Sequence, residues 1–524
     1  MVSNSQRYLS TRSSTEPYLS FEQAVIQGLA PDGGLYIPTE IPNLPENFLE
    51  EWKDLSFQEL AFNILSLYIS DDEIPAADLK TLVEKSYSTF RAEDITPLTT
   101  LNQDLGLYLL ELFHGPTYAF KDVALQFVGN LFEYFLTRRN AGKAEDAADR
   151  DIITVVGATS GDTGSAAIYG LRNKKDVSVF ILYPNGRVSP IQEAQMTSVL
   201  DPNVHTISVT GTFDDCQDLV KQVFGDKQFN DKYHVGAVNS INWARILAQI
   251  TYYFHSFFTL AKTVPGGPQA LAKKINFVVP TGNFGDILAG FYAKKMGLPV
   301  NQLIIATNSN DILDRFVKSG SYSKSASENE APVVHATMSP AMDILVSSNF
   351  ERFLWYLARE NIASSNTEAG SIVNKWMNDL KTTGSFSVPE SVLSAARAHF
   401  SSERASDEQT TETIKKVYTE VTPKYILDPH SSVAVTAALR AIKEQPKGEA
   451  QYFVALSTAH PAKFSDAVDL ALKGIDGYSF EDDVLPQEFK EMATKEKKHL
   501  YADKPDLELI KSIIVDELAK EKNI

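Results

Sequence analysis

Lys121 is the side chain in this sequence with the most evident capacity for chemistry. It follows a Gly-Pro break in FHGPTYAFKD and opens the apolar run DVALQFVGN. A lysine at the entrance to a buried helix must reach solvent, pair with an anion or react. Partial burial would lower its pKa and make the neutral amine a nucleophile toward an aldehyde. An ion pair with the adjacent Asp122, or an exposed first helical turn, explains the position equally well.

A glycine loop, PTGNFGD, spans Pro280 to Asp286 and lies between the strand-like run INFVV and a predicted helix. Gly282 and Gly285 permit a close backbone approach that a Cβ would prevent. Successive N–H groups at a helix N-terminus bind phosphate well. The alternative is a plain strand-to-helix turn. The loop lacks the Gly-Lys-Ser/Thr of a Walker sequence and the spacing of the dinucleotide fingerprint.

A second glycine loop, GATSGDTGSAA, follows the strand-like run DIITVV. Its hydroxyls and N–H groups are suited to binding a carboxylate or phosphate, whereas structural capping of the next helix is the alternative. Its candidate ligand-binding residues are Thr159, Ser160, Gly161, Asp162 and Thr163.

A third strand end, in LSTAHPAKF, places Ser457 and Thr458 before a helix that begins near Pro461. Ordinary capping explains it as well as ligand binding does. Taken together, however, these segments supply an amine for an aldehyde, an anion site for a phosphate, a hydroxyl partner for a ring nitrogen and a group for a substrate carboxylate. Pyridoxal 5'-phosphate (PLP) requires that combination.

The elements that must position these residues alternate between strands and helices. Strand-like runs such as VSVFILYP, VHTISVTG, NQLIIATN and QYFVALST are each followed by a helical or turn segment. Such alternation predicts parallel sheets, with ligands bound beyond the carboxyl ends of the strands. The predicted fold is α/β, with two parallel-sheet domains around a PLP cleft and an N-terminal mixed α+β domain.

The predicted domains follow the changes of pattern along the chain. Residues 1–100 form the N-terminal domain, and residues 101–145 and 265–475 form the large PLP-binding α/β domain. Residues 146–264 form a smaller α/β domain, and residues 476–524 a solvated C-terminal helical appendage. The Ser/Glu/Thr-rich stretch 382–420 is expected to be an exposed helical excursion.

Composition limits the classes of function. The 524 residues carry 49 Lys and Arg against 67 Asp and Glu, a net charge of −18, which disfavours nucleic acid and anionic membranes as partners. No apolar stretch is long enough to span a bilayer and the first residues lack a signal-peptide pattern, so a cytoplasmic location is the expectation. The single Cys216 excludes a disulfide framework, and its acidic neighbours predict an inert helical thiol. The nine histidines lack metal-ligand spacing, so no metal is expected.

The motifs, taken in order, resemble the threonine synthase family of the longer type, within the tryptophan-synthase-β-like (fold type II) PLP enzymes. The resemblance runs over nearly the whole chain and rests on eight blocks, namely YLSTR, SFEQAVIQGLAPDGGLYIP, FHGPTYAFKDVALQ, GATSGDTG, NSINWARILAQITYYF, PTGNFGDILAG, LDPHSSVA and STAHPAKF.

The resemblance implies a role for each candidate residue. Lys121 would form the Schiff base (internal aldimine) and act as the base, and Thr458 would face the pyridine nitrogen. Residues 159–163 would bind substrate. Motif position and charge add Asn242 and Arg245 as further candidates, Arg245 as a cation for a phosphate monoester, with a surface ion pair as the alternative. The PLP phosphate would be held by Gly282, Asn283, Phe284, Gly285 and Asp286.

The implied reaction is the conversion of O-phospho-L-homoserine and water to L-threonine and phosphate, in a monomer or weak homodimer. One alternative is another fold type II lyase, such as a serine or threonine dehydratase, against which the long N-terminal region and the NSINWAR and LDPH blocks argue. The others are a PLP-binding homologue without catalysis, and a nucleotide-binding protein that uses one of the glycine loops.

Overall fold

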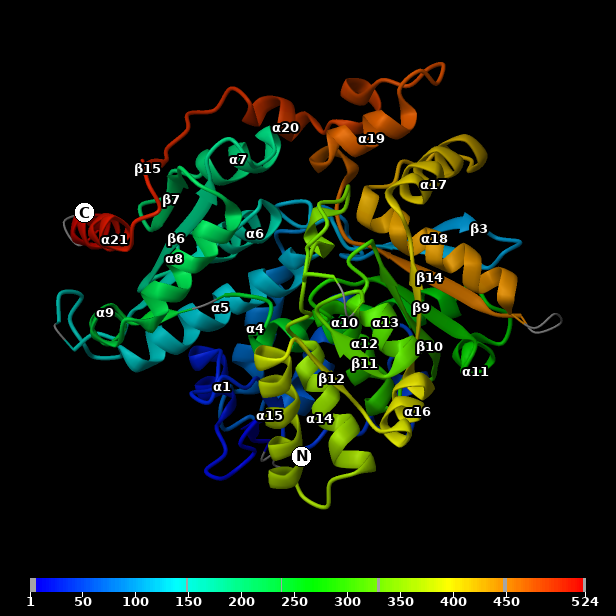
Figure 1. The fold of residues 1–524 in the computed structure, drawn as a ribbon, viewed down its shortest axis with the longest axis horizontal. Coiled ribbons are helices and arrows are strands. Elements are labelled where there is room, and N and C mark those ends of the chain that lie inside the picture. The colour runs from blue at the N-terminus through cyan, green and yellow to red at the C-terminus, as the bar shows by residue number, and fades with distance from the viewer. Residues whose placement is uncertain (1–5, 148, 237, 328–329, 446–449, 522–524) are drawn as a thin grey trace.

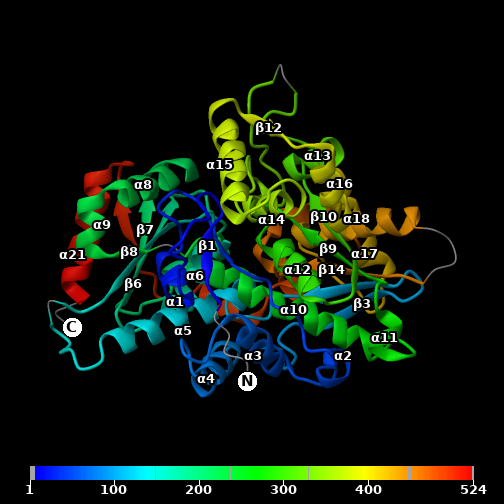
Figure 2. The same cartoon turned by 90° about the horizontal axis from the view of Figure 1, so that it is seen from below.

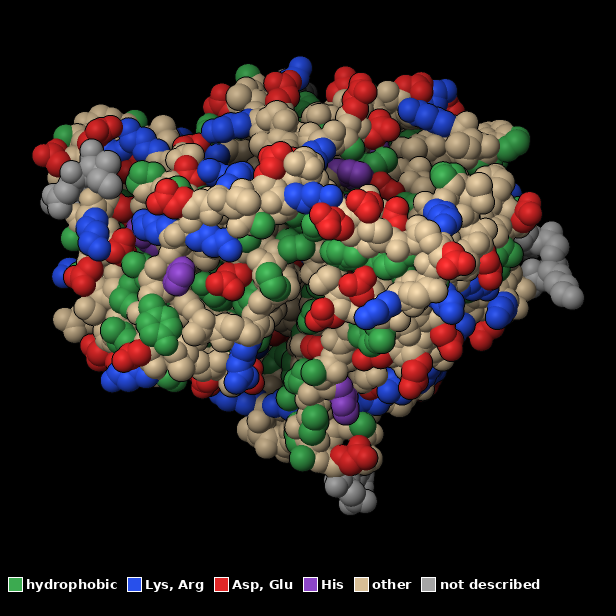
Figure 3. All heavy atoms as spheres, turned by 90° about the horizontal axis from the view of Figure 1, so that it is seen from above, with side chains coloured by type: hydrophobic (Ala, Val, Ile, Leu, Met, Phe, Trp, Pro, Cys, Tyr) green, Lys and Arg blue, Asp and Glu red, His purple; other side chains and the backbone are tan. Residues whose placement is uncertain are grey.

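Two α/β halves lie side by side in the computed structural model, with the N-terminal helices packed beneath them (Figures 1 and 2). The structure describes residues 6–147, 149–236, 238–327, 330–445 and 450–521. The predicted fold class is confirmed: two mainly parallel sheets and a separate N-terminal domain are present. A narrow furrow separates the two halves on the face shown in Figure 3.

The larger sheet places three of the predicted motifs at the carboxyl ends of its strands. Its strand order is β13-β10-β9-β14-β4-β3, and all neighbours are parallel except β3 and β4. The carboxyl ends of β4, β9 and β14 meet there because neighbouring parallel strands share a direction. The strands are β3 (Leu98–Asn102), β4 (Leu107–Glu111), β9 (Ile275–Pro280), β10 (Val300–Thr307), β13 (Phe400–Arg404) and β14 (Tyr452–Ser457).

The smaller sheet is parallel throughout and has the order β15-β7-β6-β5-β8. Its central strand β6 is buried along its whole length, as expected for an apolar run covered on both faces. The strands are β5 (Ile153–Ala158), β6 (Val177–Pro184), β7 (Val204–Val209), β8 (Val235–Gly236) and β15 (Leu500–Ala502). The helices beside them are α6 (Asp162–Leu171), α7 (Pro190–Thr197), α8 (Phe213–Gly225), α9 (Lys227–Tyr233) and α21 (Leu507–Glu521).

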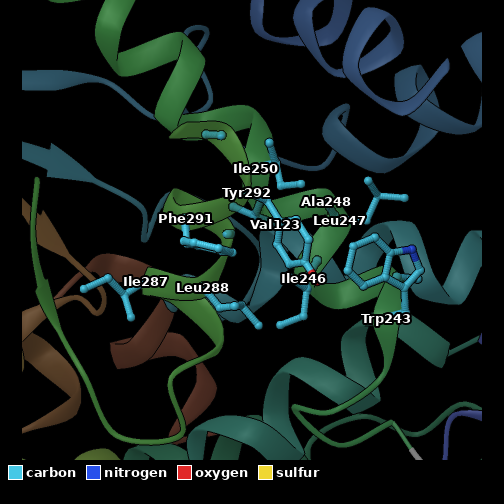
Figure 4. Close-up of a cluster of buried hydrophobic side chains, with 14 of the residues drawn as sticks. Val123, Trp243, Ile246, Leu247, Ala248, Ile250, Ile287, Leu288, Phe291 and Tyr292 are labelled. Carbon is cyan, nitrogen blue, oxygen red and sulfur yellow. The ribbon is translucent and has the colours of Figure 1, made fainter. Parts of the chain in front are cut away.

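Three helices form the core behind the larger sheet: α5 (Lys121–Arg139), α10 (Trp243–Ala261) and α12 (Gly285–Met296). Helix α10 is buried around nearly its whole circumference and packs against both other helices. Figure 4 shows Val123 of α5, Ile246 of α10 and Leu288 of α12 within one cluster. This packing fixes the start of α5 and the start of α12, where two of the motifs lie.

Helices α5 and α6 cross at unusually close range and join the two domains. A Cβ on Gly129 would lie 1.8 Å from the carbonyl oxygen of Gly170, and one on Gly170 would lie 2.5 Å from the carbonyl oxygen of Leu125. Only glycine permits such a backbone contact.

The N-terminal domain packs against α10 and contains the antiparallel pair β1–β2. Capping boxes at Ser20 and Ser56 begin its helices α1 and α3. Its elements are β1 (Tyr8–Ser10), α1 (Phe21–Gln27), β2 (Tyr36–Pro38), α2 (Phe48–Glu51), α3 (Phe57–Tyr68) and α4 (Ala76–Tyr87).

Most of the remaining elements surround the larger sheet, whereas α20 lies beside α7 (Figure 1). They are α11 (Gly267–Leu271), α13 (Ile312–Ser319), β11 (Ser321–Ser323), η1 (Pro340–Met342), α14 (Phe350–Asn361), α15 (Asn366–Thr382), β12 (Ser385–Ser387), α16 (Glu390–His399), α17 (Asp407–Glu420), α18 (Pro429–Glu444), η2 (Pro461–Lys463), α19 (Ser465–Leu472), η3 (Phe480–Val484) and α20 (Gln487–Met492).

Three expectations about the domains and their boundaries differ from the structure. The C-terminal segment is not a solvated appendage: β15 pairs with β7, and Ile510 and Ile514 of α21 are fully buried (red in Figure 1). The 382–420 stretch is not purely helical, because β13 adds an edge strand to the larger sheet. Helix α10 packs with the large domain, although the expected boundary at 264 assigned it to the small one. Short edge strands carry little periodic signal, which explains why the sequence did not indicate β15 and β13.

Cys216 is a buried residue of α8, where burial raises the pKa of its thiol to about 12. In the described part of the chain no helix has the length and apolarity needed to cross a membrane. Nor do His, Cys, Asp and Glu gather into a metal-binding group among these residues.

Candidate active site

Lys121 is the first residue of α5 and is partly buried at the edge of the larger sheet. Burial lowers the pKa of its amine to about 8. Among the nearby charges, the carboxylates of Asp162 and Asp122 raise this pKa, and the cations of Arg245 and Lys463 lower it. A large fraction of the amine is therefore neutral near pH 8, as attack on an aldehyde requires.

The side chain of Asp122 holds the loop that precedes Lys121. The Asp122 carboxylate accepts from the Thr117 N–H and the Thr117 hydroxyl, both at 2.8 Å. A Cβ on Gly115 would lie 2.4 Å from the Asp122 side chain, which explains the glycine. Asp122 is thus fixed by the loop and forms no ion pair with Lys121, contrary to the structural alternative for that lysine.

The loop 282–286 presents its N–H groups and not its carbonyl groups. Within the described residues, the main-chain N–H groups of 282–286 donate to no acceptor. The Gly282 carbonyl accepts from the Ser347 hydroxyl at 2.6 Å, and the Asn283 carbonyl accepts from the Asn349 N–H at 3.0 Å. These free N–H groups at the N-terminus of α12 form a site suited to an anion.

Two side chains of this loop point away from the anion site. Phe284 adopts a left-handed backbone conformation, with φ of 64°, and its ring packs against Phe350 and Phe353. The Asp286 carboxylate accepts hydrogen bonds from the hydroxyls of Tyr252 and Tyr253. Burial raises the pKa of Asp286 to about 7. Both residues can therefore contribute their backbone, and not their side chains, to the binding of a phosphate.

The loop 159–163 divides into engaged and free groups. The Thr159 hydroxyl accepts from the Gly161 and Gly164 N–H groups at 2.9 and 2.8 Å, so this side chain serves the loop itself. Ser160 is exposed and Thr163 partly buried, and among the described residues neither hydroxyl has a protein partner. The Asp162 and Thr163 N–H groups at the start of α6 are also free there.

Asp162 is buried and ionised. Its carboxylate pairs with the Lys463 ammonium at 2.6 Å and accepts from the Gln192 amide at 2.8 Å. Lys463 and Lys121 hold the pKa of Asp162 well below its usual range, despite burial. The Asp162 side chain was expected to bind substrate directly, but its carboxylate is already engaged in an ion pair that links the two α/β domains.

Arg245 is a buried cation without an anionic partner in the described chain. Only 3% of it is exposed, its Nη1 donates to the Val238 carbonyl at 3.2 Å, and its Nε has no partner. Burial lowers the pKa of its guanidinium to about 10. A buried guanidinium is costly unless it is paired, so a ligand anion is its natural complement.

Asn242, the other candidate of this segment, has a structural role instead. Its amide donates to the Val25 carbonyl at 2.9 Å, and its carbonyl caps α10 by accepting from the Ala244 N–H at 3.0 Å. The expectation that Asn242 binds substrate therefore differs from the observed contacts. The sequence indicated that Asn242 precedes a helix, but it did not indicate the contact with the N-terminal domain.

Thr458 lies beside the Lys121 segment. Its carbonyl accepts from the Phe120 N–H at 2.8 Å, and Ala459 bridges to Ala119. The structure thus brings together Lys121, Thr458, Asp162 and Arg245. The loop 282–286 lies against α10, the helix of Arg245, because a Cβ on Gly285 would lie 3.4 Å from Ile246. Lys463, Ser347 and Asn349 were missed. Lys463 lies in the segment STAHPAKF. Its position next to a predicted helix was the one feature that could have indicated a role.

The site and fold belong to one class of enzyme. A family described as "Pyridoxal-phosphate dependent enzyme" matches residues 90–458, a span that includes Lys121, the loop 282–286 and Thr458. The chain is therefore a PLP-dependent enzyme, and the cofactor predicted from the sequence is confirmed. Two narrower families flank this match: "Threonine synthase N terminus" matches residues 7–87, and "Threonine synthase, C-terminal" matches residues 431–514.

Individual relatives agree with these matches. The threonine synthase of Saccharomyces cerevisiae is 60% identical over the full length of both chains, and that of Schizosaccharomyces pombe is 58% identical over 99% of this chain and 100% of its own. A crystal structure of the yeast threonine synthase superposes with a TM-score of 0.93 at 60% identity, over 99% of each chain. A PLP-bound threonine synthase from Brucella melitensis gives 0.84 at 40% identity, over 98% of this chain and 99% of that one. The chain belongs to the threonine synthase family, which confirms the resemblance read from the motifs.

Proposed function

We propose that this chain converts O-phospho-L-homoserine and water into L-threonine and phosphate. The observation that carries the proposal is that one PLP enzyme offers two different groups to anions. The N–H groups of loop 282–286 suit the phosphate of the cofactor, and the unpaired Arg245 suits a second anion. A serine or threonine dehydratase acts on a substrate without a phosphate, so it would leave Arg245 buried and unpaired.

The proposed cofactor site fits the residues present. Lys121 would bind the aldehyde carbon through its amine, and the backbone of Gly282, Asn283, Phe284, Gly285 and Asp286 would hold the phosphate. Thr458 would face the pyridine nitrogen with its hydroxyl. PLP, when bound, withdraws electrons from the substrate and acidifies its Cα–H bond.

The substrate would be bound by groups that are free in the protein. The Asp162 and Thr163 N–H groups at the start of α6, with the Ser160 and Thr163 hydroxyls, would bind the substrate carboxylate. Arg245 would bind the substrate phosphate and stabilise it as it leaves Cγ. Lys121, once released from the cofactor, would accept the proton from Cα at its Nζ and return protons as water adds to Cβ.

One pair of assays tests this proposal. The purified enzyme is incubated with O-phospho-L-homoserine and phosphate release is measured, and in parallel with L-threonine while ammonia release is measured. We expect rapid phosphate release and little ammonia, with both lost in Lys121→Ala. Ammonia release from threonine at a comparable rate would favour the dehydratase, and no turnover with either substrate would favour a PLP-binding homologue without catalysis.

Three further expectations are kept as parts of this proposal. We propose a small-molecule substrate only, a monomer or weak homodimer, and a cytoplasmic location. Sedimentation of the purified protein at several concentrations tests the oligomeric state.

For the domains, the packing supports a small domain of residues 146–236 completed by residues 500–521, with α10 assigned to the large domain.

A further inference from the structure

The site contains a second lysine, Lys463, to which the proposed chemistry gives no role. It ends the short helix η2 after β14, and its side chain is completely buried. A fully buried lysine without function is rare, because its charge must be neutralised within the protein. Its contacts therefore indicate what it does.

Lys463 joins three parts of the molecule at one point. Its ammonium donates to the Asp162 carboxylate of the small domain at 2.6 Å and to the Thr117 carbonyl at 2.8 Å. The Thr117 carbonyl also accepts from the Gln195 amide of α7 at 3.0 Å. Thr117 belongs to the loop that Asp122 fixes just before Lys121. Lys463 thus ties the small domain to the segment that carries the reactive amine.

The charges around Lys121 explain why this matters for its chemistry. Among the described residues, four charged groups act on the Lys121 amine: Asp162 from α6, Arg245 from α10, Lys463 from η2, and its neighbour Asp122 on α5. Asp122 is held by Thr117, so Asp162 is the carboxylate that competes for the Lys121 ammonium. An unopposed carboxylate close to an amine favours the protonated form, which does not attack an aldehyde.

We propose that Lys463 is a positioning residue. It neutralises Asp162 and fixes the loop before Lys121, so that Lys121 is the one lysine of the site free to react with an aldehyde. The inference rests on the proposed role of Lys121 and deepens it. It divides the two lysines by function: one is the charged partner of Asp162, and the other is the neutral nucleophile.

The test measures the protonation of Lys121 without using turnover. Full-length protein stripped of cofactor is mixed with PLP, and the growth of the Schiff-base absorption band is followed from neutral to alkaline pH. The wild-type rate should rise with a midpoint near 8, the pKa of the Lys121 amine. In Lys463→Met the Asp162 charge is unopposed, so the midpoint should move up by about one pH unit, which makes the reaction about tenfold slower below it.

Three variants separate charge from packing. Asp162→Asn leaves a cation unopposed, so the midpoint should fall below the wild-type value. The double variant Lys463→Met with Asp162→Asn restores neutrality and should return the midpoint toward wild type. Lys463→Arg keeps the charge and should keep the midpoint. Lys473→Met, at an exposed lysine of the same segment, is the matched control and should change nothing.

The outcomes distinguish this inference from the proposed function. A wild-type midpoint in Lys463→Met, or a double variant that stays shifted, would overturn the inference while the Schiff base itself remained. If circular dichroism shows that Lys463→Met does not fold, Asp162→Asn decides, and an unchanged or raised midpoint there overturns the inference. A Schiff-base band that survives in Lys121→Ala would instead overturn the proposed function.

Discussion

The crossing of α5 and α6 predicts a large effect from a single methyl group. In Gly129→Ala the new Cβ would lie 1.8 Å from the Gly170 carbonyl oxygen, so the helices must separate by 1.2 Å to reach even 3.0 Å. The obstacle is backbone and cannot rotate away. Overpacking of this kind costs about 3 kcal/mol, and the better helix propensity of Ala returns about 1 kcal/mol. We expect a net destabilisation of about 2 kcal/mol.

Urea unfolding followed by circular dichroism measures this effect, with midpoints compared because a chain of several domains need not unfold in one step. Gly225→Ala is the matched control, since Gly225 ends the helix α8 and a Cβ there meets nothing within 4 Å. It should be neutral or stabilise by up to about 1 kcal/mol. PLP affinity should also fall in Gly129→Ala, because α5 and α6 carry Lys121 and Asp162. A Gly129→Ala protein as stable as wild type would refute the reasoning.

Three further predictions concern Arg245 and the loop 282–286. Gly282→Ala places a Cβ 3.0 Å from the Ala341 carbonyl oxygen, and should weaken PLP binding about tenfold in a titration, whereas unchanged affinity would show that the loop can yield. Arg245→Met should lower kcat/KM for O-phospho-L-homoserine about 10- to 100-fold without lowering the unfolding midpoint, because it removes a buried unpaired cation; lost stability with unchanged kcat/KM would contradict this. Asp286→Asn tests a pH dependence. The folded protein holds the Asp286 proton up to a pKa of about 7, against about 4 when unfolded, so wild-type stability should decline as pH rises through this window. The variant lacks that decline and should gain as much as about 4 kcal/mol relative to wild type by neutral pH. Parallel stability curves in urea unfolding at several pH values would count against it.

Local pattern predicted the strands and the loops that carry the site. The apolar run VSVFILYP coincides with β6 because a strand buried on both faces needs continuous apolar residues. The glycine loop at 282–286 was predicted to present N–H groups, but the Ser347 and Asn349 contacts that orient it come from a distant segment.

Pairings between distant segments were beyond the reach of local pattern. The Lys463–Asp162 ion pair joins two motifs that the sequence indicated one by one, without indicating that they meet. Asn242 was predicted to bind substrate because the sequence could not show its contact with the Val25 carbonyl, which lies in another domain. The strand β15 has three residues and is completed only by its neighbour β7, so its own sequence gave no alternation to detect.

The central claim is that the Lys121 amine, and no other, binds the cofactor aldehyde. Reduction of the PLP-loaded enzyme with borohydride, proteolysis and mass spectrometry locate the pyridoxyl group directly. We expect a single modified peptide, with the added mass on Lys121 and with Lys463 unmodified. A pyridoxyl group on Lys463, or a Lys121 peptide that carries none, would contradict it.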